Sequence, residues 1–267
     1  NFRAANPEWD DCRLRIQKLN DNHDGTMYIT QGFIANSVSP KTTTTLGREG
    51  SDFSAAIFAN CLDAEELTIW KDVDGLRNAD PKRFTVTEKI EHLSYFEAIE
   101  LAFYGASIIH PKTLKPLQNK NIPLKVRSFL DTSLEPSIID GTKDYIKYVP
   151  SFIVKERQTL MSITPKDYSF MNEHNRALIF NIMDELNIHA NMTQISALVL
   201  SICFDENEKK RIMLTDALSQ AFKVKYNDGL KLFTIRHYQE GLEKDFIEDK
   251  KIYVEQRSRS TYQIVLE

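Results

Sequence analysis

Five consecutive residues, Arg48 to Asp52, bring together side chains that bind acidic ligands. Arg48 carries a planar guanidinium group that donates parallel hydrogen bonds to a carboxylate or a phosphate. Gly50 allows the backbone to turn sharply and to approach a ligand closely. Ser51 and Asp52 are favoured N-cap residues for a helix over the apolar run 53–59, and helix N-termini attract anions. From these residues alone, an anion-binding loop and an ordinary helix cap are equally good interpretations.

A second polar group follows residues 67–70, whose alternating pattern predicts a buried strand. Lys71 and Asp72 come next, at the end of the strand where open α/β sheets bind ligands. Taken alone, such a Lys-Asp-Val-Asp-Gly segment is more often just a turn than a binding site. Residues 26–30 predict another strand, with Phe33 beyond its carboxyl end. We therefore expect both strand ends on the ligand side of one sheet.

The composition is that of an ordinary globular protein of 267 residues, enough for one large or two modest domains. A formal net charge of −4 does not suggest binding to nucleic acid or to a membrane surface. No apolar run is long enough to span a bilayer. The cysteines Cys12, Cys61 and Cys203 are far apart, so we expect reduced thiols, no metal site and a cytoplasmic protein.

The first half of the chain alternates between helical and extended patterns. Residues 11–19 predict a short helix, and Ser94 predicts the N-cap of a helix that runs to Phe103. Glu97 lies three residues after Ser94 and completes a capping box. Residues 131–141 are rich in polar side chains and predict a linker.

The second half predicts an α+β sandwich with an antiparallel sheet. Its order is strand, helix, strand, strand, helix, strand, at residues 158–164, 170–186, 188–196, 197–204, 206–221 and 222–226. Residues 230–238 predict a strand that opens a second copy, in which only the short acidic segment 240–249 takes the place of a full helix. An abbreviated copy leaves edge strands unpaired, so we expect a homodimer.

Sequence blocks along nearly the whole chain resemble the aspartokinases of the amino-acid kinase family. Residues 44–52, Thr-Thr-Leu-Gly-Arg-Glu-Gly-Ser-Asp, are similar to the aspartate-binding loop of that family. Further similar blocks follow in the same order, at residues 70–75, 79–81, 93–98, 104–111 and 122–126. Residues 187–192 resemble the second-strand signature of ACT regulatory domains.

The resemblance implies an α/β fold, in which a partial amino-acid-kinase sheet sandwich is followed by α+β ferredoxin-like ACT domains. The expected boundaries are 1–147 for the C-terminal part of the kinase domain, 148–228 for the first ACT domain and 229–267 for an abbreviated second one. The family's Lys-Phe-Gly-Gly-Thr segment, which supplies a catalytic lysine, does not occur in the sequence. We therefore expect an N-terminally truncated aspartokinase that has no kinase activity alone.

The activity that the resemblance implies is transfer of the ATP γ-phosphate to the side-chain carboxylate of L-aspartate, with Mg²⁺, to give 4-phospho-L-aspartate. This reaction opens the biosynthesis of lysine, threonine and methionine. Substrate contacts carry over to Arg48, Glu49, Gly50, Ser51, Asp52 and Phe33, with Arg48 holding a substrate carboxylate. Such a transfer depends on alignment and charge neutralisation, and a carboxylate nucleophile needs no proton carrier. We therefore interpret His110 as structural.

Nucleotide contacts carry over to Lys71, Asp72, Arg77, Lys82, Ser107 and Ile108. The sequence departs from the family at Ser107, where a lysine is frequent, and at Lys71, where a threonine is frequent. We expect the compact Lys71 ammonium to replace the missing cation. Glu49 is a third departure, because the family usually has glycine at that position.

The ACT region is expected to form the homodimer and to bind an amino-acid effector, lysine or threonine. Effector contacts carry over to Asn175, Arg176, His189, Asn191 and Ser196. Family sites favour an acidic residue where Asn191 stands, and an amide supplies no charge to a lysine ammonium. Loss of feedback regulation is therefore an open alternative.

Two other functions stay open at this stage. One is a different kinase of the same fold, acting on glutamate, carbamate or UMP. The other is a non-catalytic module that senses an amino acid or holds a dimer together.

Overall fold

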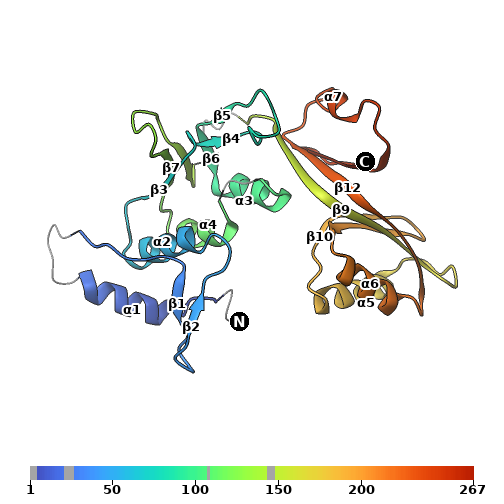
Figure 1. Cartoon of the computed structure of the whole chain (residues 1–267), viewed down its shortest axis with the longest axis horizontal. Coiled ribbons are helices and arrows are strands. Elements are labelled where there is room, and N and C mark those ends of the chain that lie inside the picture. The colour runs from blue at the N-terminus through green and yellow to red at the C-terminus, as the bar shows by residue number, and fades with distance from the viewer. Residues whose placement is uncertain (1–4, 21–26, 107–108, 143–147) are drawn as a thin grey trace. The chain divides into compact units, whose positions relative to one another are not determined.

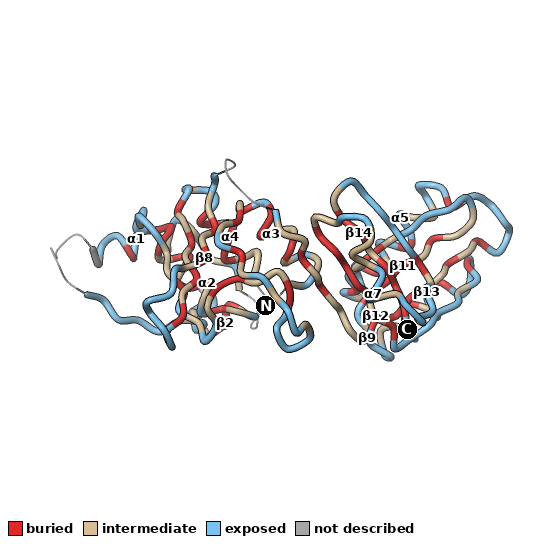
Figure 2. The backbone as a smooth tube through the Cα atoms, turned by 90° about the horizontal axis from the view of Figure 1, so that it is seen from above, coloured by how far each residue is buried: buried red, intermediate tan, exposed pale blue. Residues whose placement is uncertain are grey.

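A computed structural model of the chain describes residues 5–20, 27–106, 109–142 and 148–267. The chain divides into two compact units, Asn1–Val149 (unit 1) and Pro150–Glu267 (unit 2). In both units the buried residues, red in Figure 2, lie mainly on the strands and on the inner faces of the helices, and the exposed segments are mostly loops. No helix among the described residues combines the length and the apolar character that a bilayer crossing needs.

Unit 1 is built on a four-stranded mixed sheet in the order β3-β7-β8-β6. β3 (Leu67–Lys71) runs parallel to β7 (Leu124–Ser128), β8 (Ser137–Asp140) runs antiparallel to β7, and β6 (His92–Ser94) runs parallel to β8. Along β7 every second residue is buried, which is the pattern of a strand with one face in the core.

The helices of unit 1 are α1 (Trp9–Asn20), α2 (Gly50–Cys61), α3 (Tyr95–Tyr104) and α4 (Pro111–Gln118). α2 packs against both α1 and α4 (Figure 1). The α1–α2 contact is a cluster in which Ile16 meets Phe53 and Ile57. α3 begins as predicted, because the Ser94 side chain accepts a hydrogen bond from the Glu97 backbone N–H at 3.1 Å.

Two short antiparallel ribbons complete unit 1. β1 (Ile34–Asn36) pairs with β2 (Thr43–Thr45), and β4 (Leu76–Arg77) pairs with β5 (Lys89–Ile90). The strand predicted at residues 26–30 is wrong over its described part, since the first strand begins only at Ile34. The linker predicted at 131–141 is also wrong in part, because it contains the central strand β8. Ser137 and Ile139 of β8 are fully buried, a pattern too short to stand out among polar neighbours.

Unit 2 is an antiparallel six-stranded sheet in the order β10-β11-β9-β12-β14-β13. Its strands are β9 (Ser151–Pro165), β10 (Ala190–Ile195), β11 (Leu200–Asp205), β12 (Phe222–Arg236), β13 (Ile252–Arg257) and β14 (Thr261–Leu266). Helices α5 (Glu173–Glu185) and α6 (Glu208–Leu218) pack on the sheet through a core that includes Ile163, Ile179 and Leu214. Only the four-residue α7 (Lys244–Ile247) stands between β12 and β13.

β9 and β12 are the long central strands of unit 2, with 15 residues each (Figure 1). β12 joins the two strands that the sequence predicts at 222–226 and 230–238 into one. A bulge between Asn227 and Leu230 interrupts its pairing with β9 at the junction. The architecture therefore has the expected form, an α/β unit followed by an antiparallel sheet with helices packed on it.

Candidate active site

The Arg48 bend is held in shape by its own backbone. Gly47 and Glu49 both adopt positive φ angles, 83° and 54°, and the Gly50 N–H donates to the Gly47 carbonyl at 3.1 Å. α2 therefore begins at Gly50, with Glu49 as its N-cap residue and no side-chain cap bond. The predicted cap at Ser51 or Asp52 is wrong, because the left-handed Glu49 starts the helix earlier and leaves both residues in its first turn.

Gly50 and Phe33 meet in a close contact. A Cβ added at Gly50 would lie 2.7 Å from Cδ2 of Phe33, so only glycine fits beside that ring. The Phe33 backbone is fixed by two bonds: its N–H donates to Ser54 Oγ at 2.9 Å and its carbonyl accepts from the Leu46 N–H at 2.9 Å. Phe33 therefore lies at the bend as predicted, brought there by the turn before β1 rather than by the end of a strand.

Glu49 connects the bend to the start of α4. Its Oε2 accepts a hydrogen bond from the His110 backbone N–H at 2.8 Å. His110 in turn caps α4, since its Nδ1 accepts from the Lys112 N–H at 3.1 Å. Burial lowers the pKa of His110, with the nearby Lys112 and Arg48 charges acting in the same direction and Glu49 opposing them. The neutral imidazole that this favours is the form that can accept the cap bond, which agrees with a structural role.

Asp52 connects the bend to the end of β3. Its Oδ2 lies 3.3 Å from Lys71 Nζ, and both side chains are largely shielded, with exposed fractions of 20% and 30%. The two polar groups found in the sequence thus lie next to each other. Arg48, four residues before Asp52 in the same bend, is exposed, and no described carboxylate forms an ion pair with it.

Of the predicted nucleotide residues after β3, Arg77 is held by internal hydrogen bonds, whereas Asp72 and Lys82 are exposed. Arg77 donates to both carboxylate oxygens of Asp74, at 3.1 and 2.7 Å, and to the backbone and side-chain oxygens of Thr87, at 3.0 and 2.8 Å. Its guanidinium therefore braces the turn, and its nucleotide contact stays a prediction. Asp72 and Lys82 are exposed at the same turn region. Ser107 and Ile108 lie outside the described residues.

Ser137 fixes the end of the turn that follows β3, a role that the sequence does not reveal. Its Oγ accepts from the Leu76 N–H at 2.8 Å and donates to the Ile90 carbonyl at 2.6 Å. Gly75 has φ 139°, and a Cβ there would lie 2.4 Å from that Oγ. Ser54 and Glu49 likewise position the bend by contacts distant in sequence. Only Gly75 gives a local signal, because a glycine in a turn often marks a positive φ.

The predicted effector residues are spread over three elements of unit 2. Asn175 and Arg176 bond within the first turn of α5, where Arg176 pairs with Glu173. His189 is exposed, and Ser196 bonds the Val199 N–H at 3.1 Å in the turn between β10 and β11.

Asn191 is the centre of an internal polar network. Its Oδ1 accepts from Lys155 Nζ at 2.8 Å, and its Nδ2 donates to Gln158 Oε1 and Asp205 Oδ1, both at 2.8 Å. Burial lowers the pKa of Lys155, and the nearby Asp205 opposes that effect. The chain's own ammonium therefore already occupies the Asn191 acceptor.

Comparison with known proteins agrees with this geometry. Residues 6–128 match the model of the amino acid kinase family. The chain is 30% identical over 224 residues to the chloroplastic bifunctional aspartokinase/homoserine dehydrogenase 2 of Zea mays, covering 82% of this chain and 24% of that protein. It is also 30% identical over 230 residues to lysine-sensitive aspartokinase 3 of Escherichia coli K12, covering 82% and 49%.

Solved structures give the same result. E. coli aspartokinase III in complex with aspartate and ADP superimposes with a TM-score of 0.81 at 25% identity, covering 100% of this chain and 63% of that one. The same enzyme in complex with lysine and aspartate gives a TM-score of 0.73. The chain spans a quarter to a half of the length of the curated relatives named above. Residues 6–128 therefore match the amino acid kinase family, and the chain resembles the aspartokinases along most of its length.

Proposed function

We propose that the protein carrying this chain is an aspartate kinase, which transfers the γ-phosphate of ATP to the side-chain carboxylate of L-aspartate and gives 4-phospho-L-aspartate. The observation that carries the proposal is that one bend holds both an exposed Arg48, which pairs with no described carboxylate, and Asp52, which contacts Lys71 at the end of β3. The aspartokinase names of its relatives, and the aspartate and ADP named for a similar structure, support the choice of substrates.

The charges at the site suit two anions that must be brought together. Arg48 is placed to hold the substrate carboxylate, together with the Ser51 N–H in the first turn of α2, while the Gly50 N–H holds the bend through the Gly47 carbonyl. Asp52 either receives the substrate ammonium or orients Lys71, and the 3.3 Å contact favours orientation. Lys71 then supplies the cation for a transferring phosphate, as an ammonium point charge.

ATP and Mg²⁺ fit this residue set in part. Within the described ranges, no group of three His, Cys, Asp or Glu side chains is placed to hold a metal ion. Mg²⁺ usually keeps several waters and binds one or two carboxylates together with substrate phosphates. Asp72, exposed at the turn after β3, is the available carboxylate. When bound, Mg²⁺ would neutralise phosphate charge, while Arg48 and Lys71 align the two reactants.

Regulation, assembly and location belong to the same proposal. We propose lysine or threonine as the effector of unit 2, with Asn175, Arg176, His189 and Ser196 as contacts. Asn191 would contact the effector only by exchanging its bond to Lys155. A homodimer through unit 2 is supported by its exposed apolar side chains. The three free cysteines support a cytoplasmic location.

The test is aspartate-dependent release of ADP, measured in a coupled assay on the gene product that carries these residues. The proposal predicts turnover with L-aspartate and a large loss in the Arg48→Gln variant. Turnover with glutamate, carbamate or UMP in place of aspartate would assign a different kinase of the same family. No turnover with any of them would favour the non-catalytic alternative.

A further inference from the structure

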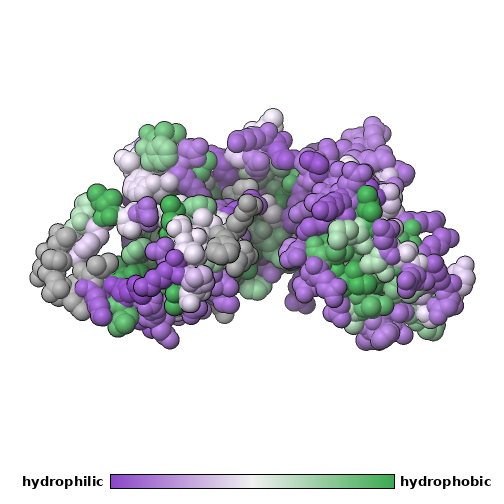
Figure 3. Space-filling view, turned by 60° about the horizontal axis from the view of Figure 1, so that its bottom comes forward, coloured by the Kyte–Doolittle hydropathy of each residue, from purple (hydrophilic) through white to green (hydrophobic). Residues whose placement is uncertain are grey.

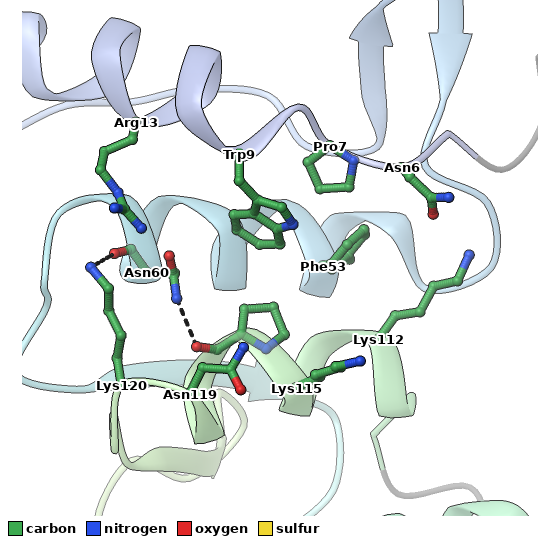
Figure 4. A pocket seen from close by; sticks show the side chains of 11 residues that line it. Asn6, Pro7, Trp9, Arg13, Phe53, Asn60, Lys112, Lys115, Asn119 and Lys120 are labelled. Atoms are coloured by element: carbon green, nitrogen blue, oxygen red, sulfur yellow. Dashed lines mark hydrogen bonds between the residues drawn. The ribbon is translucent and has the colours of Figure 1, made fainter.

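A groove in unit 1, apart from the candidate active site, has no role in the proposed reaction. It is formed by α1, α2 and α4 and encloses about 500 Å³ (Figure 4). Binding pockets for small molecules in proteins measure about 300–1,000 Å³, so the groove has the size of a ligand site. It lies entirely within residues 6–120 of unit 1.

Apolar side chains line the middle of the groove. Trp9 of α1 and Phe53 of α2 line it (Figure 4), as does Pro116 of α4, and Phe53 is only 5% exposed in the buried cluster against which Trp9 packs. Trp9 is partly buried against the α1–α2 core, which holds its indole ring in place. The partly exposed Trp9 indole is therefore the aromatic surface on which a planar ring can stack.

The two ends of the groove are basic. Lys112 and Lys115 lie at one end, and Arg13 and Lys120 lie at the other (Figure 4). Lys120 is already neutralised by Asp63 and donates to the Asn60 carbonyl at 2.7 Å. No described carboxylate pairs with Arg13, Lys112 or Lys115, and no acidic residue lines the groove.

Arg13 provides the observation that points to a ligand. Its Nε is shielded from solvent and has no hydrogen-bond partner in the described structure. A buried donor without an acceptor is unfavourable, and a charged donor more so. Arg13 as a whole is only partly buried and lines the groove, so an acceptor oxygen of a bound molecule can reach its guanidinium group. The amides of Asn60 and Asn119 also line the groove and add polar contacts along its length.

We infer that this groove binds a small planar aromatic anion, whose ring stacks on Trp9 and whose phosphate or carboxylate groups reach Arg13 at one end and Lys112 and Lys115 at the other. The inference does not depend on the proposed kinase activity. Since α2 and α4 begin at the candidate active site and also line the groove, such a ligand would contact both helices.

Fluorescence of Trp9 tests the inference directly. The chain has two tryptophans, so a Trp70→Phe background leaves Trp9 as the reporter. The probes are adenosine monophosphate, benzene-1,4-dicarboxylate, adenosine and inorganic phosphate. The inference predicts a saturable change in Trp9 emission with at least one ring anion, and binding of adenosine and of phosphate at least about tenfold weaker. The two ring anions distinguish a phosphate ligand from a carboxylate ligand.

Variants decide where the probe binds. Arg13→Gln and Lys115→Gln should each weaken binding about tenfold, while Lys18→Gln, an exposed charge on α1 away from the groove, should not. Arg48→Gln should leave the Trp9 titration unchanged, which separates the groove from the proposed active site. Thermal unfolding checks that each variant folds. Because Lys115 is exposed, Lys115→Gln still tests the inference if Arg13→Gln does not fold. No saturable change with either ring anion, or equal affinity in Lys115→Gln, would overturn the inference.

Discussion

At the scale of single residues, the candidate site depends on backbone conformations that few residue types can adopt. Gly75 holds φ 139° and Gly50 accepts the Phe33 ring at a distance that excludes a Cβ. His110 matters as a neutral hydrogen-bond acceptor rather than as a proton carrier. Gly75 and His110 each lead to a prediction that can be measured without a substrate.

Gly75→Ala should destabilise unit 1 by about 2–4 kcal/mol, because the new Cβ adds a clash with Ser137 Oγ to an unfavourable positive φ. Gly229→Ala in unit 2 is the matched control. Gly229 also has a positive φ, 72°, but open space around it, so the cost should be only about 1–2 kcal/mol. Denaturant unfolding followed by circular dichroism measures both. Equal losses would mean that the turn can move away from Ser137.

His110→Asn should reduce the loss of stability as the pH falls below 6.5, the ordinary pKa of histidine, because asparagine is a good N-cap that does not titrate in this range. The folded-state pKa of His110 lies below its ordinary value of 6.5, so the unfolded chain binds the proton first as the pH falls. The wild-type chain therefore has the full contribution of this group above pH 6.5 and loses it as the pH falls through the lowered pKa. Unfolding curves at several pH values compare the two proteins. Parallel curves would contradict this account of His110.

At the scale of elements, local signals predicted helix starts better than strand positions. Ser94 and Glu97 lie within one turn, and the structure has their predicted cap. The start of α2 was mispredicted, because a left-handed Glu49 is held by a bond to His110, 61 residues away. β8 was missed for the same kind of reason, since its pairing with β6 and β7 is set by distant segments.

The candidate site could likewise be predicted only where its signals are local in the sequence. The sequence indicated both polar groups, at Arg48–Asp52 and at Lys71–Asp72, and the resemblance assigned them to one site. The connection between them, the Asp52–Lys71 contact, could not be read from spacing because it joins a helix to a strand end across the fold. The sequence likewise did not reveal that Arg77 pairs with Asp74 or that Asn191 accepts a hydrogen bond from Lys155.

The contact between α2 and β3 leads to a prediction on turnover. Lys71→Met should lower kcat for aspartate-dependent ADP release by at least about tenfold, since a developing phosphate charge would lose its cation. Stability should change by less than about 1 kcal/mol, because partly exposed ion pairs contribute little. Lys125→Met is the matched control for turnover, because Lys125 on β7 has the same exposed fraction, 30%, and pairs with Glu66. Unchanged turnover in Lys71→Met would refute the replacement of the missing family lysine by Lys71.

At the scale of the whole molecule, unit 2 has an exposed apolar surface of the kind that binds another protein. Leu178 and Phe180 of α5, Ile212 and Met213 of α6 and Ile195 of the edge strand β10 are between 38% and 46% exposed. Figure 3 shows apolar residues gathered on one face of this unit. Large exposed apolar patches on soluble proteins commonly mark interaction sites, and an unpaired edge strand adds to that tendency.

Phe180→Glu and Met213→Glu should therefore weaken a homodimer at least about tenfold, because a buried unpaired carboxylate opposes association. Ile252→Glu, on the opposite edge strand β13 and 38% exposed, is the control that should leave the dimer intact. Sedimentation equilibrium over a range of concentrations measures all three. A monomer in the unmodified chain, or a dimer that only Ile252→Glu disrupts, would contradict an interface on this face.

One measurement tests the central claim, that the Arg48 guanidinium holds the acidic substrate. Aspartate-dependent ADP release is compared between Arg48→Gln and Arg259→Gln, an exposed and unpaired arginine of unit 2, in the gene product that carries this chain. Loss of a bidentate charged contact to the substrate predicts a fall in kcat/KM of about a hundredfold or more for Arg48→Gln, with unchanged stability, and no change for Arg259→Gln. Equal kcat/KM values in the two variants would show that Arg48 does not bind the substrate.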